Sequence, residues 1–214
     1  MRLAAVPFLL ATLLPFQASY AQDEAVSLAI DNAQTRVLAL AYKGGAASAV
    51  AHDHVIHART VTGTGTWHPT DASQCSISVD VKVHDLFPDA NDMRQMVGLP
   101  GTLTDGQRDE ILGHVLARYQ LWAEQHSQIT FRSTSISGTT GSVTVQGDFT
   151  MRGVTKPLSV PMQLTETDGT VRAVGQVQIK QSDFGYQPYS ALFGALKVKD
   201  AVDLVVDITL QPAG

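Results

Sequence analysis

Apolar and polar residues alternate over most of the chain. The clearest run covers residues 142–151, where Val143, Val145, Phe149 and Met151 share one face and polar residues occupy the other. Alternation with a period of two is typical of a β-strand that buries one face. Comparable runs lie at residues 25–30, 36–42, 55–66, 77–83, 128–137, 158–164, 171–179 and 202–210. The pattern therefore predicts eight or nine strands.

Turn residues separate several of these strands, including Gly138, Gly141 and the pair Asp168-Gly169. Strands joined by short turns are antiparallel neighbours. So many strands in one domain must close into a barrel or fold into a sandwich to hide their edges. We favour an all-β, antiparallel barrel of about eight strands. Such a barrel can be filled by its own side chains or can hold one ligand, and the pattern leaves both alternatives open.

One segment departs from the β pattern and predicts an amphipathic helix over residues 105–120. Its apolar residues fall at helical spacing: Ile111, Leu112, Val115, Leu116 and Tyr119. Thr104 followed by Gln107 fits a capping box at the helix start. We expect this inserted helix to close one end of the barrel. The preceding residues 86–103 contain prolines and glycines and predict an irregular loop.

The N-terminus predicts export. Arg2 is followed by a mostly apolar stretch over residues 3–16, which is too short to span a bilayer, and by small residues at Ser19 and Ala21. This is typical of a signal peptide, residues 1–21, cleaved after Ala21. We expect residues 22–214 to form one domain in the periplasm.

Charge and cysteine content narrow the function further. The chain carries a net charge of −5, and loss of residues 1–21 removes one arginine and no acid, which leaves −6. A nucleic-acid partner is therefore not expected. Cys75 is the only cysteine, so an internal disulfide is excluded. We interpret Cys75 as a structural residue.

The densest group of polar residues surrounds two histidines, His52 and His54. On a strand, residues two apart point to the same face, so both imidazoles could reach one metal ion. His57 would lie on the other face, and spacing supplies no third ligand. The alternative interpretation is a set of hydrogen-bonded histidines at the rim of the barrel.

Catalytic motifs are not found in the sequence: it has no nucleophile elbow and no phosphate-binding glycine loop followed by a helix. We therefore expect a protein that is not an enzyme and needs no cofactor. Residues 181–190 place Phe184, Tyr186 and Tyr189 in a loop before the last strand. These aromatic residues predict either a plug over the core or a gate over an apolar cavity.

Three parts of the sequence form recognisable motifs. Residues 147–158 read GDFTMRGVTKPL, residues 182–185 and 198–202 read SDFG and VKDAV, and residues 51–56 read AHDHVI. They resemble, in this order, a strand and turn, the C-terminal signature and the histidine-bearing segment of one branch of the YceI-like family of exported lipid- or polyisoprenoid-binding proteins. The segments span most of residues 22–214 in the family's order.

The resemblance implies a lipocalin-like barrel whose interior takes an isoprenoid or another long-chain amphiphile in the periplasm. The inward strand faces then supply the candidate lipid-binding residues Phe131, Phe149, Met151, Leu164, Val177 and Val206. Phe184 and Tyr186 would close the cavity. His52 and His54 would meet the head group at the rim.

The leading hypothesis is therefore non-catalytic lipid binding or carriage, with transient membrane contact and a homodimer as further hypotheses about partners. A second hypothesis is a metal-binding or metal-dependent protein that uses His52 and His54. A third is an envelope protein that binds another protein at its rim.

Overall fold

The computed structural model describes residues 24–139 and 141–213. It contains twelve strands: Val26–Ile30 (β1), Arg36–Gly44 (β2), His54–Ala58 (β3), Val61–Trp67 (β4), Ser76–Lys82 (β5), Leu86–Pro88 (β6), Gln128–Thr139 (β7), Ser142–Met151 (β8), Val154–Thr167 (β9), Thr170–Lys180 (β10), Ser190–Ala191 (β11) and Leu196–Pro212 (β12). Two α-helices are described, Asn91–Met96 (α1) and Asp105–Leu116 (α2). Neither is long and apolar enough to cross a bilayer.

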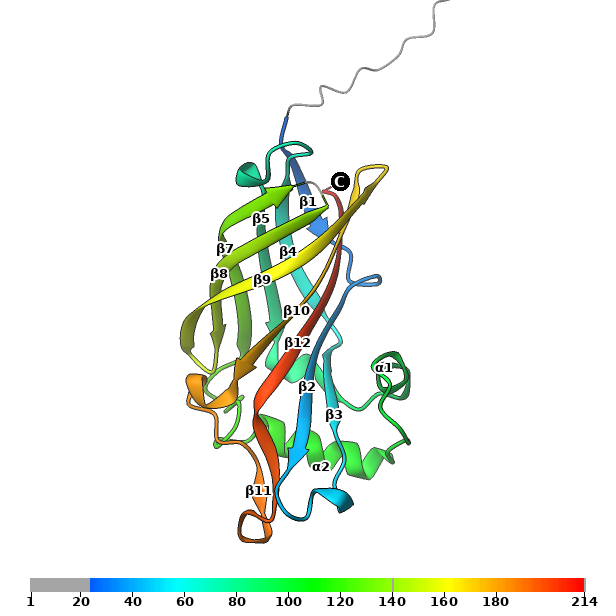
Figure 1. Cartoon of the computed structure of the whole chain (residues 1–214), viewed down its shortest axis with the longest axis vertical. Helices are drawn as coiled ribbons and strands as arrows, with labels where there is room; N and C mark the ends of the chain where they lie inside the picture. Colours follow the sequence, from blue (N-terminus) through cyan, green and yellow to red (C-terminus); the bar gives the residue numbers. More distant parts are fainter. Residues whose placement is uncertain (1–23, 140, 214) are drawn as a thin grey trace, which may run out of the picture.

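Eight antiparallel strands close into a barrel. The order around the wall is β1-β4-β5-β7-β8-β9-β10-β12, and β12 pairs back to β1. Figure 1 shows these strands wrapped around the long axis, with α2 across the lower end. The predicted all-β, lipocalin-like barrel is confirmed.

Three neighbouring strands of the barrel wall are interrupted at a similar level. Each of them is divided into two pieces, which are β1 and β2, β3 and β4, and β5 and β6. The pieces β2, β3 and β6 pair beside β12 in the order β12-β2-β3-β6. Asn32 joins two of the breaks, because its side chain accepts from the amide of Val61 at 2.6 Å and donates to the carbonyl of Arg59 at 3.3 Å. The single strand predicted over residues 55–66 is therefore wrong in one respect: it bends at Arg59 and continues as a second strand.

The remaining strands are long and joined by tight turns. The turns Arg152-Gly153 and Asp168-Gly169 have positive φ at both central residues, 54° and 73° in the first and 51° and 78° in the second. Two such residues match the right-handed twist of a two-residue hairpin. These turns fix the register of β8, β9 and β10, which keeps one face of each strand directed inward.

The helical region differs from the prediction in two respects. The capping box between Thr104 and Gln107 is present and starts α2 at Asp105, but the helix ends at Leu116, because Ala117 has an extended backbone. Tyr119 therefore lies outside the helix and is exposed. The stretch predicted as an irregular loop, residues 86–103, contains β6 and the short helix α1.

Candidate ligand-binding cavity

The barrel encloses a cavity of about 260 Å³. Every strand of the closed ring contributes to its wall, together with β2, β3, β6 and α2. Among the described residues, its lining contains no Asp, Glu, Lys, Arg or His. The interior is therefore an uncharged, almost entirely apolar space.

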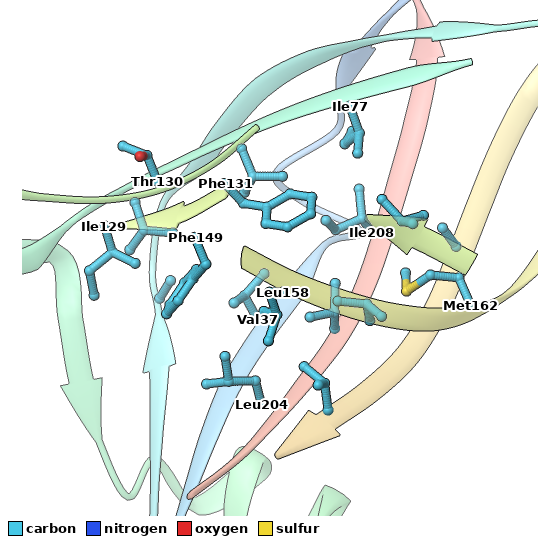
Figure 2. Close-up of a pocket in the computed structure, with 18 of the residues that line it drawn as sticks. Val37, Ile77, Ile129, Thr130, Phe131, Phe149, Leu158, Met162, Leu204 and Ile208 are labelled. Atoms are coloured by element: carbon cyan, nitrogen blue, oxygen red, sulfur yellow. The ribbon is translucent and has the colours of Figure 1, made fainter. Parts of the chain in front are cut away.

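Many inward-facing side chains remain accessible from this space. Val177, Leu204 and Val206 point into the barrel but are only half-buried, and Figure 2 shows Leu204 and its neighbours around an open centre. A tightly packed core would bury such residues completely. Of the two alternatives left open by the sequence, the structure has the barrel with internal space.

Seven of the eight predicted lipid-binding residues line the cavity: Phe131, Phe149, Met151, Leu164, Val177, Tyr186 and Val206. Their contact with a ligand stays a prediction. Phe184 is placed differently, since it is 2% exposed and packs edge-to-face against Phe149, with ring centroids 5.4 Å apart. Phe184 therefore supports the wall from behind.

Phe131 takes its position in the cavity because Gly147 lies beside it. These residues belong to the neighbouring strands β7 and β8, and a Cβ atom at position 147 would lie 2.4 Å from Cζ of Phe131. Any other residue would displace the ring. In Figure 2 the ring of Phe131 projects inward between Ile208 and Phe149, so Gly147 helps to set the shape of the cavity.

The lower end is closed by α2 and by the loop after β10. Val115 and Leu121 line the cavity from one side, and Tyr186 and Gln181 line it from the other. Tyr186 donates a hydrogen bond from its hydroxyl to Oε1 of Gln120 at 3.0 Å, and burial raises the pKa of its phenol well above the usual range. The side chain of Gln181 donates to the carbonyl of Lys199 at 2.8 Å. We call α2 and the loop after β10 the lid. The hydroxyl of Tyr186 and the side-chain amide of Gln181 in this lid are thus hydrogen-bonded within the protein.

The two histidines predicted as a pair have different surroundings. β3 begins at His54, so His52 precedes the strand and is exposed, and the prediction that both lie on one strand face is wrong. Nδ1 of His54 donates to Asp89 at 2.7 Å. Within residues 24–139 and 141–213, no group of three or more His, Cys, Asp or Glu is arranged to hold a metal ion.

His54 belongs to a buried polar cluster that we call the clasp: His54, Asp89 and Arg94. Asp89 is 0% exposed and accepts from the amide of Val55 at 3.1 Å and from Arg94 at 2.6 Å. Burial by itself would raise the pKa of Asp89, but the hydrogen bonds and charges of the clasp outweigh it and hold that pKa below its usual range.

Arg94 completes the clasp from α1. Its guanidinium also donates to the carbonyls of Asp53, Pro100 and Gly101, at 3.0, 2.6 and 3.1 Å. The bond to Asp53 fastens the segment after β6 to the residue that precedes β3. Sequence reasoning missed Asp89 and Arg94, because they lie 35 and 40 positions from His54 and no local pattern connects them.

Fold and cavity together define a class: an antiparallel, lipocalin-like barrel with an enclosed apolar space. The family model described as YceI-like domain matches residues 28–210. The chain therefore belongs to the YceI-like family, as its sequence predicted. No curated protein matches the chain at a significant level.

Solved structures share this fold at low sequence identity. A crystal structure of Burkholderia cenocepacia BcnA has a TM-score of 0.64 and 19% identity, over 84% of this chain and 98% of that one. A mutant Campylobacter jejuni YceI protein with a monobromobimane guest has a TM-score of 0.58 and 12% identity, over 74% of this chain and 85% of that one. Another Campylobacter jejuni YceI structure has a TM-score of 0.56 and 12% identity, with the same coverage.

Proposed function

We propose that this protein is a non-catalytic periplasmic protein that binds or carries a long-chain amphiphile, an isoprenoid or another lipid, inside its barrel. The observation that carries the proposal is the cavity of about 260 Å³, which is enclosed by apolar side chains and lacks ionisable Asp, Glu, Lys, Arg and His among the described residues.

The lining selects the chemical class of ligand. A charged group inside the barrel would lose its hydration with no counter-charge to compensate, which is strongly unfavourable. An alkyl or prenyl chain gains about 0.8 kcal/mol for each methylene removed from water. The chain of the ligand therefore occupies the cavity and a charged head group stays outside.

The binding proposal is tested by native mass spectrometry of residues 22–214, followed by solvent extraction of the bound material. We expect a bound lipid that is lost in Phe149→Asp, because that substitution places a carboxylate in the apolar cavity. Gln146→Asp is the matched control, since Gln146 is exposed on the outer face of the same strand. A lipid-free wild-type protein that also takes up no added polyprenol would contradict the proposal.

Export is tested separately by cell fractionation of the whole chain with a C-terminal tag. We expect a product that starts at Gln22 in the periplasmic fraction. The proposed cleavage site lies outside the described residues, so N-terminal sequencing of the product is the decisive measurement. An uncleaved product in the cytoplasm would contradict this part of the proposal.

A further inference from the structure

Two loops meet at the end of the molecule beyond α2. One connects β2 to β3 and the other connects β11 to β12, and Figure 1 shows both at this end. The amide of Ala47 donates to the carbonyl of Ala195 at 2.8 Å. A Cβ atom at Gly45 would lie 2.4 Å from the same carbonyl, so only glycine permits this approach. The two loops therefore form one structure, which we call the tip.

The tip exposes three large apolar side chains. Val50 is 77% exposed, Leu192 is 65% exposed and Phe193 is 112% exposed, the highest values among the exposed large apolar residues. Leu192 and Phe193 both have a left-handed backbone, with φ of 51° and 55°. This conformation is unfavourable for residues other than glycine, and such strain concentrates at functional positions. The turn thus holds two apolar side chains out in solvent at a conformational cost.

Three lysines lie directly behind these side chains. Lys197 pairs with Gly44 and Val198 pairs with Lys43 where β12 meets β2, and Lys199 follows. Lys197 and Lys199 are exposed. The five ion pairs found in the described ranges involve none of the three lysines. Two carboxylates lie beside the lysines: Asp53 accepts from the backbone amide of Lys43 at 2.8 Å, and Asp200, which follows Lys199, accepts from Ser182. The three lysines outnumber these two carboxylates, so the surroundings of the tip are positive on a chain of net charge −5.

We propose that the tip docks on an anionic lipid bilayer, with Leu192, Phe193 and Val50 inserted among the lipids and the lysines against the head groups. Apolar and aromatic side chains next to lysines match the two layers of a bilayer surface. A second copy fits less well, because the lysines would repel each other and a convex tip with three large apolar residues offers less area than a stable dimer buries.

Docking would place the membrane next to the lid of the cavity. The lid residues Gln181 and Tyr186 precede the start of β11 by nine and four residues, and β11 leads directly into the tip. This inference rests on the proposed lipid-binding function, because it makes the tip the place where a lipid passes between bilayer and barrel.

The test is cosedimentation of residues 22–214 with vesicles of phosphatidylcholine, with and without roughly one quarter phosphatidylglycerol. These residues contain the complete closed barrel, and they omit the apolar N-terminal stretch, which could itself bind vesicles. We expect binding to the anionic vesicles that weakens at least about tenfold in the double variant Leu192→Ser/Phe193→Ser. The control is Val174→Ser, an exposed apolar residue on the barrel wall.

The lysines are tested in the same assay. The double variant Lys197→Gln/Lys199→Gln should weaken binding about fivefold for each lysine, and about 0.5 M salt should weaken wild-type binding similarly. Lys82→Gln/Lys156→Gln removes two exposed lysines elsewhere and should bind like the wild type. In Phe193→Trp, vesicles should shift the tryptophan emission to shorter wavelength. Equal sedimentation of the wild type and both tip variants would overturn the proposal.

A separate measurement distinguishes failure of this inference from failure of the proposed function. Polyprenol added from solvent, without vesicles, should load the wild type and Leu192→Ser/Phe193→Ser equally, because the tip does not line the cavity. Transfer of polyprenol out of anionic vesicles should be slower in the variant. Equal transfer rates overturn docking alone, whereas a lack of loading in both proteins overturns the binding function.

Discussion

The cavity and the clasp are both buried, and their chemistry is opposite. The cavity is apolar and leaves its inward side chains partly uncovered. The clasp buries a carboxylate and a guanidinium completely and bonds both through several partners. The ionisable groups therefore fasten a loop, while the space for a ligand is kept free of charge. The histidine segment, which sequence reasoning connected with metal or head-group binding, takes part in the fastening through His54.

A substitution in the clasp should have the largest effect on the free energy of unfolding. Asp89→Ala leaves the guanidinium of Arg94 buried without its carboxylate, and the loss of one partner of a buried ion pair costs about 3–5 kcal/mol of unfolding free energy. Urea denaturation measures the change. Asp80→Ala removes the more exposed pair with Arg132 and should cost at most about 1 kcal/mol. If Asp89→Ala also cost at most about 1 kcal/mol of unfolding free energy, the clasp would contribute no more to stability than an exposed ion pair.

A low pH should also weaken the clasp, with a smaller effect on stability than Asp89→Ala. The clasp lowers the pKa of Asp89 below its value in the unfolded chain, about 3.9. Its contribution to stability is therefore present above that pH and is lost as the pH falls through the lower, folded value. The stability difference between the wild type and Asp89→Asn, measured by denaturation at falling pH, should narrow below about pH 4. A constant difference would contradict this.

A smaller pH effect is expected at His57, which packs edge-to-face against Phe87 with ring centroids 5.6 Å apart. Its buried Nδ1 has no hydrogen-bond partner in the described part of the chain, and burial lowers the pKa of the ring. The neutral form is thus favoured on folding, and stability falls as the pH drops below the unfolded value of about 6.5. His57→Phe should lose less unfolding free energy between about pH 7 and pH 5 than the wild type. An unchanged dependence of the unfolding free energy on pH would contradict this.

The strands and most of the cavity wall were predictable because a residue's place in an alternating strand decides whether it faces inward. Phe131 and Val206 follow from this rule alone. The break at Arg59 was not predictable, because it depends on Asn32, which lies in the turn between β1 and β2. The clasp was not predictable for the same reason, because Asp89 and Arg94 lie far from His54 in the sequence. The exposure of Leu192 and Phe193 was not predictable either, because it depends on the left-handed turn at these two residues.

The smallest expected change in stability comes from filling the cavity itself. Ala173→Phe adds a ring to the inward face of β10, where Ala173 lines the open space. Overpacking a filled core costs about 1–3 kcal/mol, so a smaller cost here would show that the space accepts the ring. The ring should also displace a bound chain, and native mass spectrometry should then show less lipid than in the wild type. Val174→Phe, directed outward on the same strand, should keep the wild-type lipid content. If Ala173→Phe retained its lipid, the binding site would lie elsewhere in the barrel. If the variant lost its lipid but kept its stability, ligand binding would depend on the cavity and folding would not, in contrast to the clasp, on which folding depends.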